Sequence, residues 1–248
     1  MVIGLVTVFR LMVLVQYLLR KNGIHGLIFK KGKSSFICAL LKEHEFHLKN
    51  DDGSGISGIW YIYREEDENV KKLKFEFGKK AYEKLDVRFL KKLDVDLMEM
   101  VGKRCVIVLD DQEFELTRSK GLQSMLHSAG SVYAHHKELW IFVLCQSVAV
   151  LKKNHKLHSA VSQSTHMIFF RNLLEGKSVC RYLSNLSIKL KGGMSLGDVF
   201  ERYIQTKLYS YLLMLVSPRL SSSKALSNIL IDADGPMLRF DDSDGETG

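Results

Sequence analysis

The sequence has little proline, with two residues among 248, and it contains no low-complexity tract. Proline-rich and repetitive stretches are typical of linkers between domains, so their scarcity disfavours a multidomain layout. A hydrophobic content of 46% in a chain of this length is sufficient for a sizeable core. We therefore expect one large domain rather than a string of small modules.

Closely spaced cysteines are also missing. The four cysteines are Cys38, Cys105, Cys145 and Cys180, and no C-x-x-C pair occurs, which excludes the dense disulfide framework of small secreted proteins. No Cys/His spacing matches a zinc pattern, although His135 and His136 are adjacent. Because three of the cysteines lie in apolar runs, we expect buried thiols and a reducing, intracellular compartment.

A long uninterrupted apolar run is absent as well. The first residues, MVIGLVTVFRLMVLVQYLL, are largely apolar, but Arg10 divides them and Gln16 follows. A membrane-spanning helix needs about 18 consecutive apolar residues, and a signal peptide needs a charged start before its apolar run. Residues 1–22 therefore form an apolar segment of uncertain role: a buried strand or helix, a membrane segment, or an unrepresentative start of the chain. We do not expect a membrane partner.

The charge is distributed unevenly. Residues 232–248 carry six acidic residues and one arginine, whereas residues 1–231 carry 35 basic and 22 acidic residues, a net charge of +13. This surplus suits a polyanionic partner such as nucleic acid, although solvated surface lysines would account for it equally well. We expect residues 232–248 to form an acidic, flexible tail.

Apolar runs of strand length recur at residues 25–29, 58–63, 105–109, 139–145, 166–170 and 209–216. They are rich in β-branched and aromatic residues and show no polar alternation, which is typical of strands covered on both faces. Segments compatible with helices lie between them, at residues 33–46, 119–135, 175–186 and 195–208. This alternation predicts an α/β domain over residues 23–231, with a mostly parallel, doubly wound sheet flanked by helices. Such sheets bind ligands at the carboxyl ends of their strands.

The stretch RCVIVLDDQEFE, residues 104–115, runs from an apolar strand directly into Asp110 and Asp111. Two interpretations fit this pattern. In the first, a buried strand simply meets an acidic turn. In the second, Asp110 holds magnesium, directly or through water, and Asp111 orients or deprotonates a water that attacks a nucleotide phosphate.

The segment GKSS matches the second half of a phosphate loop, G-x-x-x-x-G-K-[ST], in which the lysine reaches the terminal phosphates and the hydroxyl binds magnesium. The candidate ATP-binding residues are Gly32, Lys33, Ser34 and Ser35, with Ser34 as a magnesium ligand. The first half of the motif is not intact. Leu27 stands where the first glycine belongs, the nearest glycine is Gly26, and the loop interior IFKK is bulky.

A third polar residue follows another apolar run. Gln146 comes directly after residues 139–145, and a side-chain amide in this position can sense a terminal phosphate or position water. The alternative is an ordinary polar residue at the end of a strand. The phosphate-loop segment, the acidic pair about 75 residues later and this glutamine occur in the order found in phosphate-loop ATPases that have additional central strands.

From about residue 58 to residue 231 the chain resembles the genome-packaging ATPases of the FtsK/HerA-type superfamily that are encoded by Polinton (Maverick) elements, adenovirus-like viruses and large DNA viruses. The similar stretches are CVIVLDDQ, AHHKELWIFVLCQSVAVL, LHSAVSQSTHMIFFRN and FERYIQTKLYSYLLMLV. The resemblance implies a P-loop NTPase-like fold, with ATP and magnesium as cofactors and a homo-oligomeric ring acting on double-stranded DNA. It further implies capsid proteins as partners and a location in the host nucleus or a virus factory.

Carried across by position, the resemblance also assigns basic residues. Those expected to contact DNA or to act on a neighbouring subunit's nucleotide are Lys152, Lys153, Lys156 and Arg171; a solvated basic loop is the alternative for the lysines. The family normally has the complete glycine-rich loop, from which this chain departs. Two functions therefore remain open: an ATP-driven packaging motor, and a diverged DNA-binding or assembly protein that keeps the fold without hydrolysing ATP. A third function, a membrane-associated protein anchored through residues 2–19, has the least support.

Overall fold

The computed structural model describes residues 23–28, 33–42, 55–79, 85–145, 166–170, 176–185, 194–204, 211–215, 228–231 and 237–239. The described strands are β1 (Gly23–Ile28), β2 (Gly58–Tyr63), β3 (Asp86–Leu90), β4 (Cys105–Asp110), β5 (Trp140–Cys145), β6 (His166–Phe170), β7 (Tyr211–Leu215), β8 (Asn228–Ile231) and β9 (Met237–Arg239). They form one sheet in the order β3-β2-β4-β5-β1-β6-β7-β8-β9. The pairs from β3 to β6 are parallel, and those from β6 to β9 are antiparallel.

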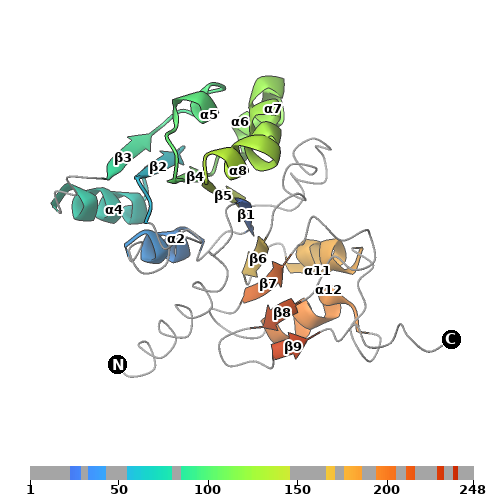
Figure 1. Cartoon of the computed structure of the whole chain (residues 1–248). Coiled ribbons are helices and arrows are strands. Elements are labelled where there is room, and N and C mark those ends of the chain that lie inside the picture. The colour runs from blue at the N-terminus through green and yellow to red at the C-terminus, as the bar shows by residue number, and fades with distance from the viewer. Residues whose placement is uncertain are drawn as a thin grey trace.

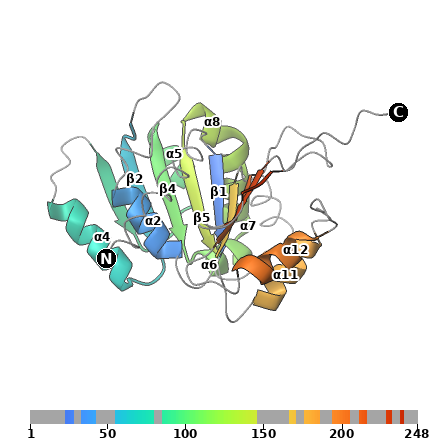
Figure 2. The ribbon, with the colours of Figure 1, turned by 90° about the horizontal axis from the view of Figure 1, so that it is seen from below.

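Helices cover both faces of the parallel part of the sheet. The described helices are α2 (Lys33–Lys42), α4 (Glu68–Lys79), α5 (Leu97–Met100), α6 (Glu113–Arg118), α7 (Lys120–Ser128), α8 (Ala134–His136), α11 (Gly176–Ser184) and α12 (Leu196–Val199), with π-helical turns η1 (Ala129–Tyr133) and η2 (Phe200–Ile204). Figure 1 shows α2 and α4 on one side of the strands and α5 to α8 on the other, and Figure 2 shows the same arrangement from below. The expected α/β architecture with a parallel sheet flanked by helices is confirmed.

The core sits where three central strands lie side by side. Every residue of β2, β4 and β5 is buried. These strands are apolar except for Asp110 at the end of β4, and helices cover them from both sides. Trp60 and Trp140 are among the largest fully buried side chains. The carboxyl ends of these strands are therefore held by a rigid, closely packed body.

Local signals fix the ends of several helices. The Asp67 carboxylate accepts a hydrogen bond from the backbone N–H of Val70 at 2.8 Å, which caps the start of α4. Ser195 and Asp198 form a capping box at the start of α12. The Lys137 ammonium donates to the backbone carbonyls of Met98, Glu99 and Val101, so one cation satisfies the carbonyl end of α5.

Some elements differ from the expectation. The strand expected at residues 105–109 extends to Asp110, and the helix expected at residues 119–135 is divided into α7, η1 and α8. β3 and α4 were not anticipated, nor was β8. β9 lies within residues 232–248, the segment expected to be an acidic tail, where it pairs with β8.

Within the described ranges, no helix combines the length and the apolar character that crossing a bilayer requires. The apolar segment 1–22 lies outside those ranges.

Candidate active site

The parallel register brings the ends of β1 and β4 to the same level of the sheet. Asp110 of β4 lies opposite Leu144 of β5, and Leu27 of β1 lies opposite the same Leu144 from the other side. Adjacent strands are about 4.8 Å apart, so the backbones at Asp110 and Leu27 are separated by roughly 10 Å. The chain leaves β1 one residue later, after Ile28, and enters α2 at Lys33. The start of α2 and the acidic pair therefore share one rim.

Asp110 is a buried carboxylate whose side chain is 6% exposed. The Tyr61 hydroxyl, from the neighbouring strand β2, donates a hydrogen bond to its Oδ2 at 2.7 Å. The Gln112 side chain, which is 2% exposed, donates from Nε2 to the Asp110 backbone carbonyl at 3.2 Å. Both the side chain and the backbone of Asp110 are thus anchored by buried residues.

Helix α2 lies near the Asp110 carboxylate. Burial raises the pKa of the Cys38 thiol, on α2, to about 12, and the negative charges of Asp67 and Asp110 contribute to this rise. The pKa of Tyr61 is also raised, first by burial and then by the charge of Asp110 and its hydrogen bond, with a smaller contribution from Cys38. Such charge effects weaken with distance. Residues of α2, β2 and β4 therefore meet on one face of the sheet.

Asp111 occupies a different environment. It has a positive φ of 54°, the left-handed conformation that aspartate and asparagine tolerate better than most residues. Its side chain is partly exposed, in contrast to that of Asp110. The next residue, Gln112, is the N-cap of α6. The left-handed turn thus separates a buried carboxylate from a more accessible one, which fits two different chemical roles.

The other expected site residues are less fully defined. Lys33, Ser34 and Ser35 form the first turn of α2, and their side chains are not described. Several candidates lie outside the described residues: Gly32, Gln146, Lys152, Lys153, Lys156 and Arg171. The structure nevertheless fixes the strands that precede two of them. β5 ends at Cys145, opposite Ile28 of β1, and β6 ends at Phe170, one residue before Arg171.

Among the described residues, no group of three or more His, Cys, Asp or Glu side chains could hold a metal ion, but a magnesium site needs fewer protein ligands. Magnesium is bound through one or two carboxylates, together with water and substrate phosphates. Asp110 supplies a carboxylate at the end of a central strand, and the Tyr61 hydroxyl donates to one of its two oxygens. Asp110 is therefore chemically suited to hold the ion, and Ser34, in the first turn of α2, is the hydroxyl donor that the sequence pattern assigns to it.

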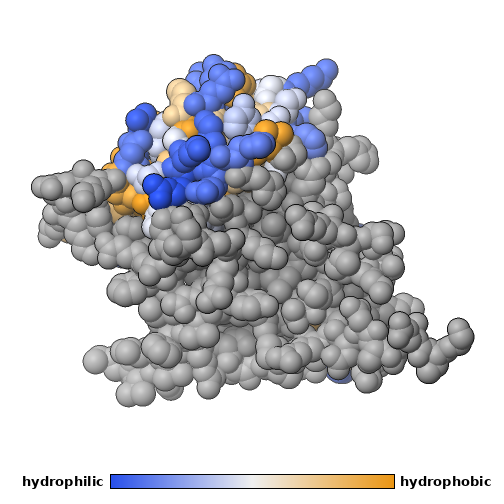
Figure 3. All heavy atoms as spheres, viewed as in Figure 1, coloured by the Kyte–Doolittle hydropathy of each residue, from blue (hydrophilic) through white to orange (hydrophobic). Residues whose placement is uncertain are grey.

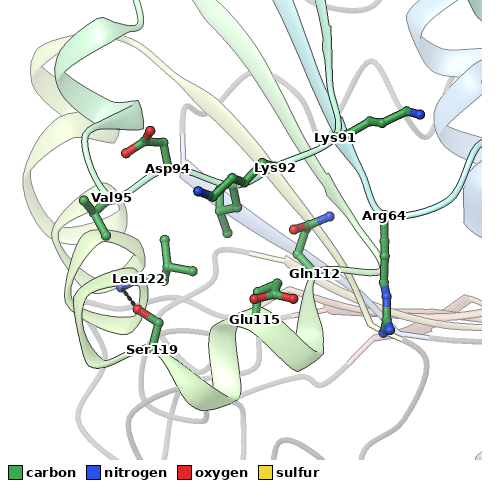
Figure 4. A pocket seen from close by; sticks show the side chains of 10 residues that line it. Arg64, Lys91, Lys92, Asp94, Val95, Gln112, Glu115, Ser119 and Leu122 are labelled. Atoms are coloured by element: carbon green, nitrogen blue, oxygen red, sulfur yellow. Dashed lines mark hydrogen bonds between the residues drawn. The ribbon is translucent and has the colours of Figure 1, made fainter.

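A pocket of about 530 Å³ lies beside the acidic turn, near the carboxyl ends of β2 and β3 and against α6 and α7. Its lining residues are Arg64, Lys91, Lys92, Leu93, Asp94, Val95, Gln112, Glu115, Ser119 and Leu122. Figure 4 shows Gln112 between Arg64 on one side and Leu122 and Val95 on the other. Because the amide of Gln112 also holds the Asp110 carbonyl, the pocket and the acidic turn share one buried side chain.

The described part of the surface that is visible in Figure 3 is mainly hydrophilic. Figure 3 shows charged and polar residues over most of the coloured face, with hydrophobic residues between them. Among the basic residues, the Arg64 and Arg118 guanidinium groups lie over the exposed Phe114 ring, at 5.1 and 3.7 Å from its centroid. Guanidinium groups held on an aromatic ring keep their donors available to phosphates or other anions.

Tyr61 and Gln112 were missed by the sequence interpretation. Gln112 directly follows the acidic pair, so its position alone could have marked it. Tyr61 is 49 residues away from Asp110, and the contact depends on β2 pairing with β4 rather than with β1. No pattern in the sequence near Tyr61 or Asp110 indicates that β2 pairs with β4.

No protein-family model matches this chain, and a search of curated proteins finds no match.

Proposed function

We propose that this protein is an ATP-driven double-stranded DNA translocase of the genome-packaging type, built on a P-loop NTPase-like domain and working as a homo-oligomeric ring. The observation that carries the proposal is the common rim of Lys33 and Asp110. The helix that begins at Lys33 follows β1, Asp110 ends β4, and both strands reach the same level of β5. An open parallel sheet binds its ligands at this rim.

The strand order gives further support. β5 lies between β1 and β4, which is the arrangement expected for phosphate-loop ATPases that have an additional central strand. It also brings the end of β5, and hence the start of the segment containing Gln146, between the two proposed halves of the site. A glutamine here would be suited to sense the terminal phosphate.

In the proposed mechanism, each site residue has a separate role in ATP hydrolysis. Lys33 would neutralise the terminal phosphates, and backbone N–H groups in the first turn of α2 would donate to phosphate oxygens. Magnesium, when bound by Asp110 and Ser34, would supply charge neutralisation during phosphoryl transfer. Asp111, which is more accessible than Asp110, would accept the proton of the attacking water. Positioning and electrostatic stabilisation contribute most of the catalysis in such reactions.

The imperfect phosphate loop favours a second candidate function. Ile28, Phe29, Lys30 and Lys31 stand where small residues let backbone N–H groups approach phosphate. A chain with this loop could retain the fold as a non-hydrolysing DNA-binding or assembly protein. The basic surplus of residues 1–231 suits either function.

The substitution Lys33→Ala tests the site assignment. We expect it to lower the rate of magnesium-dependent ATP hydrolysis about a hundredfold or more, because charge stabilisation of the terminal phosphate contributes several kcal/mol. Phosphate release by the purified protein measures this rate. Lys42→Ala is the matched control: Lys42 ends the same helix and pairs with Glu76 at the surface, so its removal should change the rate less than about threefold.

Two results would contradict the assignment. Hydrolysis by the Lys33→Ala protein at the parent rate would remove Lys33 from the site. If the parent protein binds DNA but gives no calorimetric heat with ATP and magnesium, the non-hydrolysing function replaces the motor.

A further inference from the structure

We propose that Tyr61 is a positioning residue that holds the Asp110 carboxylate in the orientation needed to bind the metal ion. This inference rests on the proposed function and extends it, because neither the phosphate-loop pattern nor the acidic pair points to a residue of β2.

The geometry of the pair is direct. The Tyr61 Oη lies 2.7 Å from Asp110 Oδ2, within the usual range for an O–H donor and an oxygen acceptor. Tyr61 is fully buried and Asp110 is 6% exposed. A hydrogen bond from a phenol to a buried carboxylate restricts the rotation of that carboxylate and leaves lone pairs for other donors or for a cation.

Tyr61 is itself held in place. It lies in β2 opposite Val108 of β4, two residues before Asp110, so Tyr61, Val108 and Asp110 belong to one face of the sheet. Its ring stacks against Phe89 of β3, with centroids 6.1 Å apart. A side chain that is fixed by strand pairing on one side and ring stacking on the other offers a rigid support for the carboxylate.

The Tyr61 hydroxyl has one O–H group, and it donates that group to the Asp110 carboxylate. Partners of this kind, which orient a metal ligand without touching the metal, typically change metal affinity 10- to 100-fold when they are removed.

Tyr61→Phe is the test, because phenylalanine keeps the ring and removes only the hydroxyl. The probe is Mn²⁺, which substitutes for Mg²⁺ and is followed by electron paramagnetic resonance in the presence of a non-hydrolysable ATP analogue. We expect the Mn²⁺ affinity of the protein–nucleotide complex to fall roughly 10- to 100-fold. Affinity for the analogue without metal should change less than about twofold, which separates loss of metal orientation from general damage to the pocket.

Tyr63→Phe provides the matched control. Tyr63 is also a buried tyrosine of β2, but its hydroxyl accepts a hydrogen bond from Lys74 at 2.7 Å. Tyr63→Phe should leave Mn²⁺ affinity unchanged, and thermal melting without nucleotide should show that both variants fold.

The outcomes separate the inference from the proposed function. Parent protein that binds Mn²⁺ with the analogue, with Tyr61→Phe within twofold of it, would overturn the role of Tyr61 and leave the nucleotide site in place. An equal loss in Tyr61→Phe and Tyr63→Phe would also overturn it, because it would indicate a structural effect of β2. Failure of the parent protein to bind the metal–nucleotide complex would overturn the proposed function itself.

Discussion

Asp110→Asn should reduce kcat for ATP hydrolysis about 10²- to 10³-fold while the protein stays folded. The substitution removes one negative charge and keeps the size of the side chain. The asparagine oxygen can still accept the hydrogen bond from Tyr61 that Asp110 accepts now. A metal ion and its ligand contribute several kcal/mol to stabilising the charge that develops in phosphoryl transfer, and about 1.4 kcal/mol corresponds to a tenfold change in rate.

Thermal unfolding should accompany the rate measurement. Asparagine keeps the shape of the side chain and an oxygen that accepts from Tyr61, so the melting temperature should change little. Loss of activity without loss of stability distinguishes a functional carboxylate from one that holds the fold together.

Asp86→Asn is a suitable control for charge removal. Asp86 begins β3, at the opposite end of the sheet from the rim, and its carboxylate accepts hydrogen bonds from Trp60 and Arg88. Hydrolysis by this variant should remain within about threefold of the parent. An Asp110→Asn protein with full activity would return the acidic pair to the simpler interpretation, an acidic turn after a buried strand.

DNA binding should depend steeply on salt. Residues 1–231 carry a net charge of +13, and a ring that grips duplex DNA through its phosphates releases one counterion for each phosphate that it neutralises. For about 6–10 phosphate contacts, affinity falls about 10³- to 10⁵-fold between 50 and 200 mM salt. Fluorescence anisotropy with a labelled duplex measures the slope of log affinity against log salt, and the slope should not depend on the DNA sequence.

The basic residues Lys152, Lys153 and Lys156 allow a more specific prediction. Simultaneous replacement of Lys152, Lys153 and Lys156 with alanine should reduce the magnitude of the salt slope by about two to three, because each phosphate contact contributes about 0.9. Lys71 and Lys72 of α4, both exposed, are the control pair, and their replacement should leave the slope unchanged. An unaltered slope in the triple variant would identify the lysines as solvated surface charges.

The parts of the fold that could be predicted from the sequence are those with a strong local signal. β2, β4 and β5 were predictable because each contains a continuous run of at least five apolar residues. α4 was not predicted because six of its twelve residues are charged, although Val70 and Leu73 have the spacing of a buried helical stripe. β3 is a short edge strand whose exposed residues Asp86 and Arg88 alternate with less exposed ones, so it lacks the continuous apolar run of the central strands.

The candidate site also has parts that could be predicted from the sequence and parts that could not. Asp110 and Asp111 stand out in the sequence because two carboxylates follow an apolar run. Their different environments could not be predicted from the sequence. The burial of Asp110 depends on Tyr61 and on α2, and the left-handed turn at Asp111 depends on the start of α6. Strand order is a long-range property of the chain. For that reason the position of β5 between β1 and β4 could be established only from the structure.

The most direct test is a structure of the protein with magnesium and a non-hydrolysable ATP analogue. We expect the terminal phosphates to lie at the first turn of α2, within hydrogen-bonding distance of the Lys33 ammonium, and the metal ion to lie between those phosphates and the Asp110 carboxylate. A nucleotide bound elsewhere on the molecule, or a site in which Lys33 and Asp110 contact different ligands, would contradict the motor proposal.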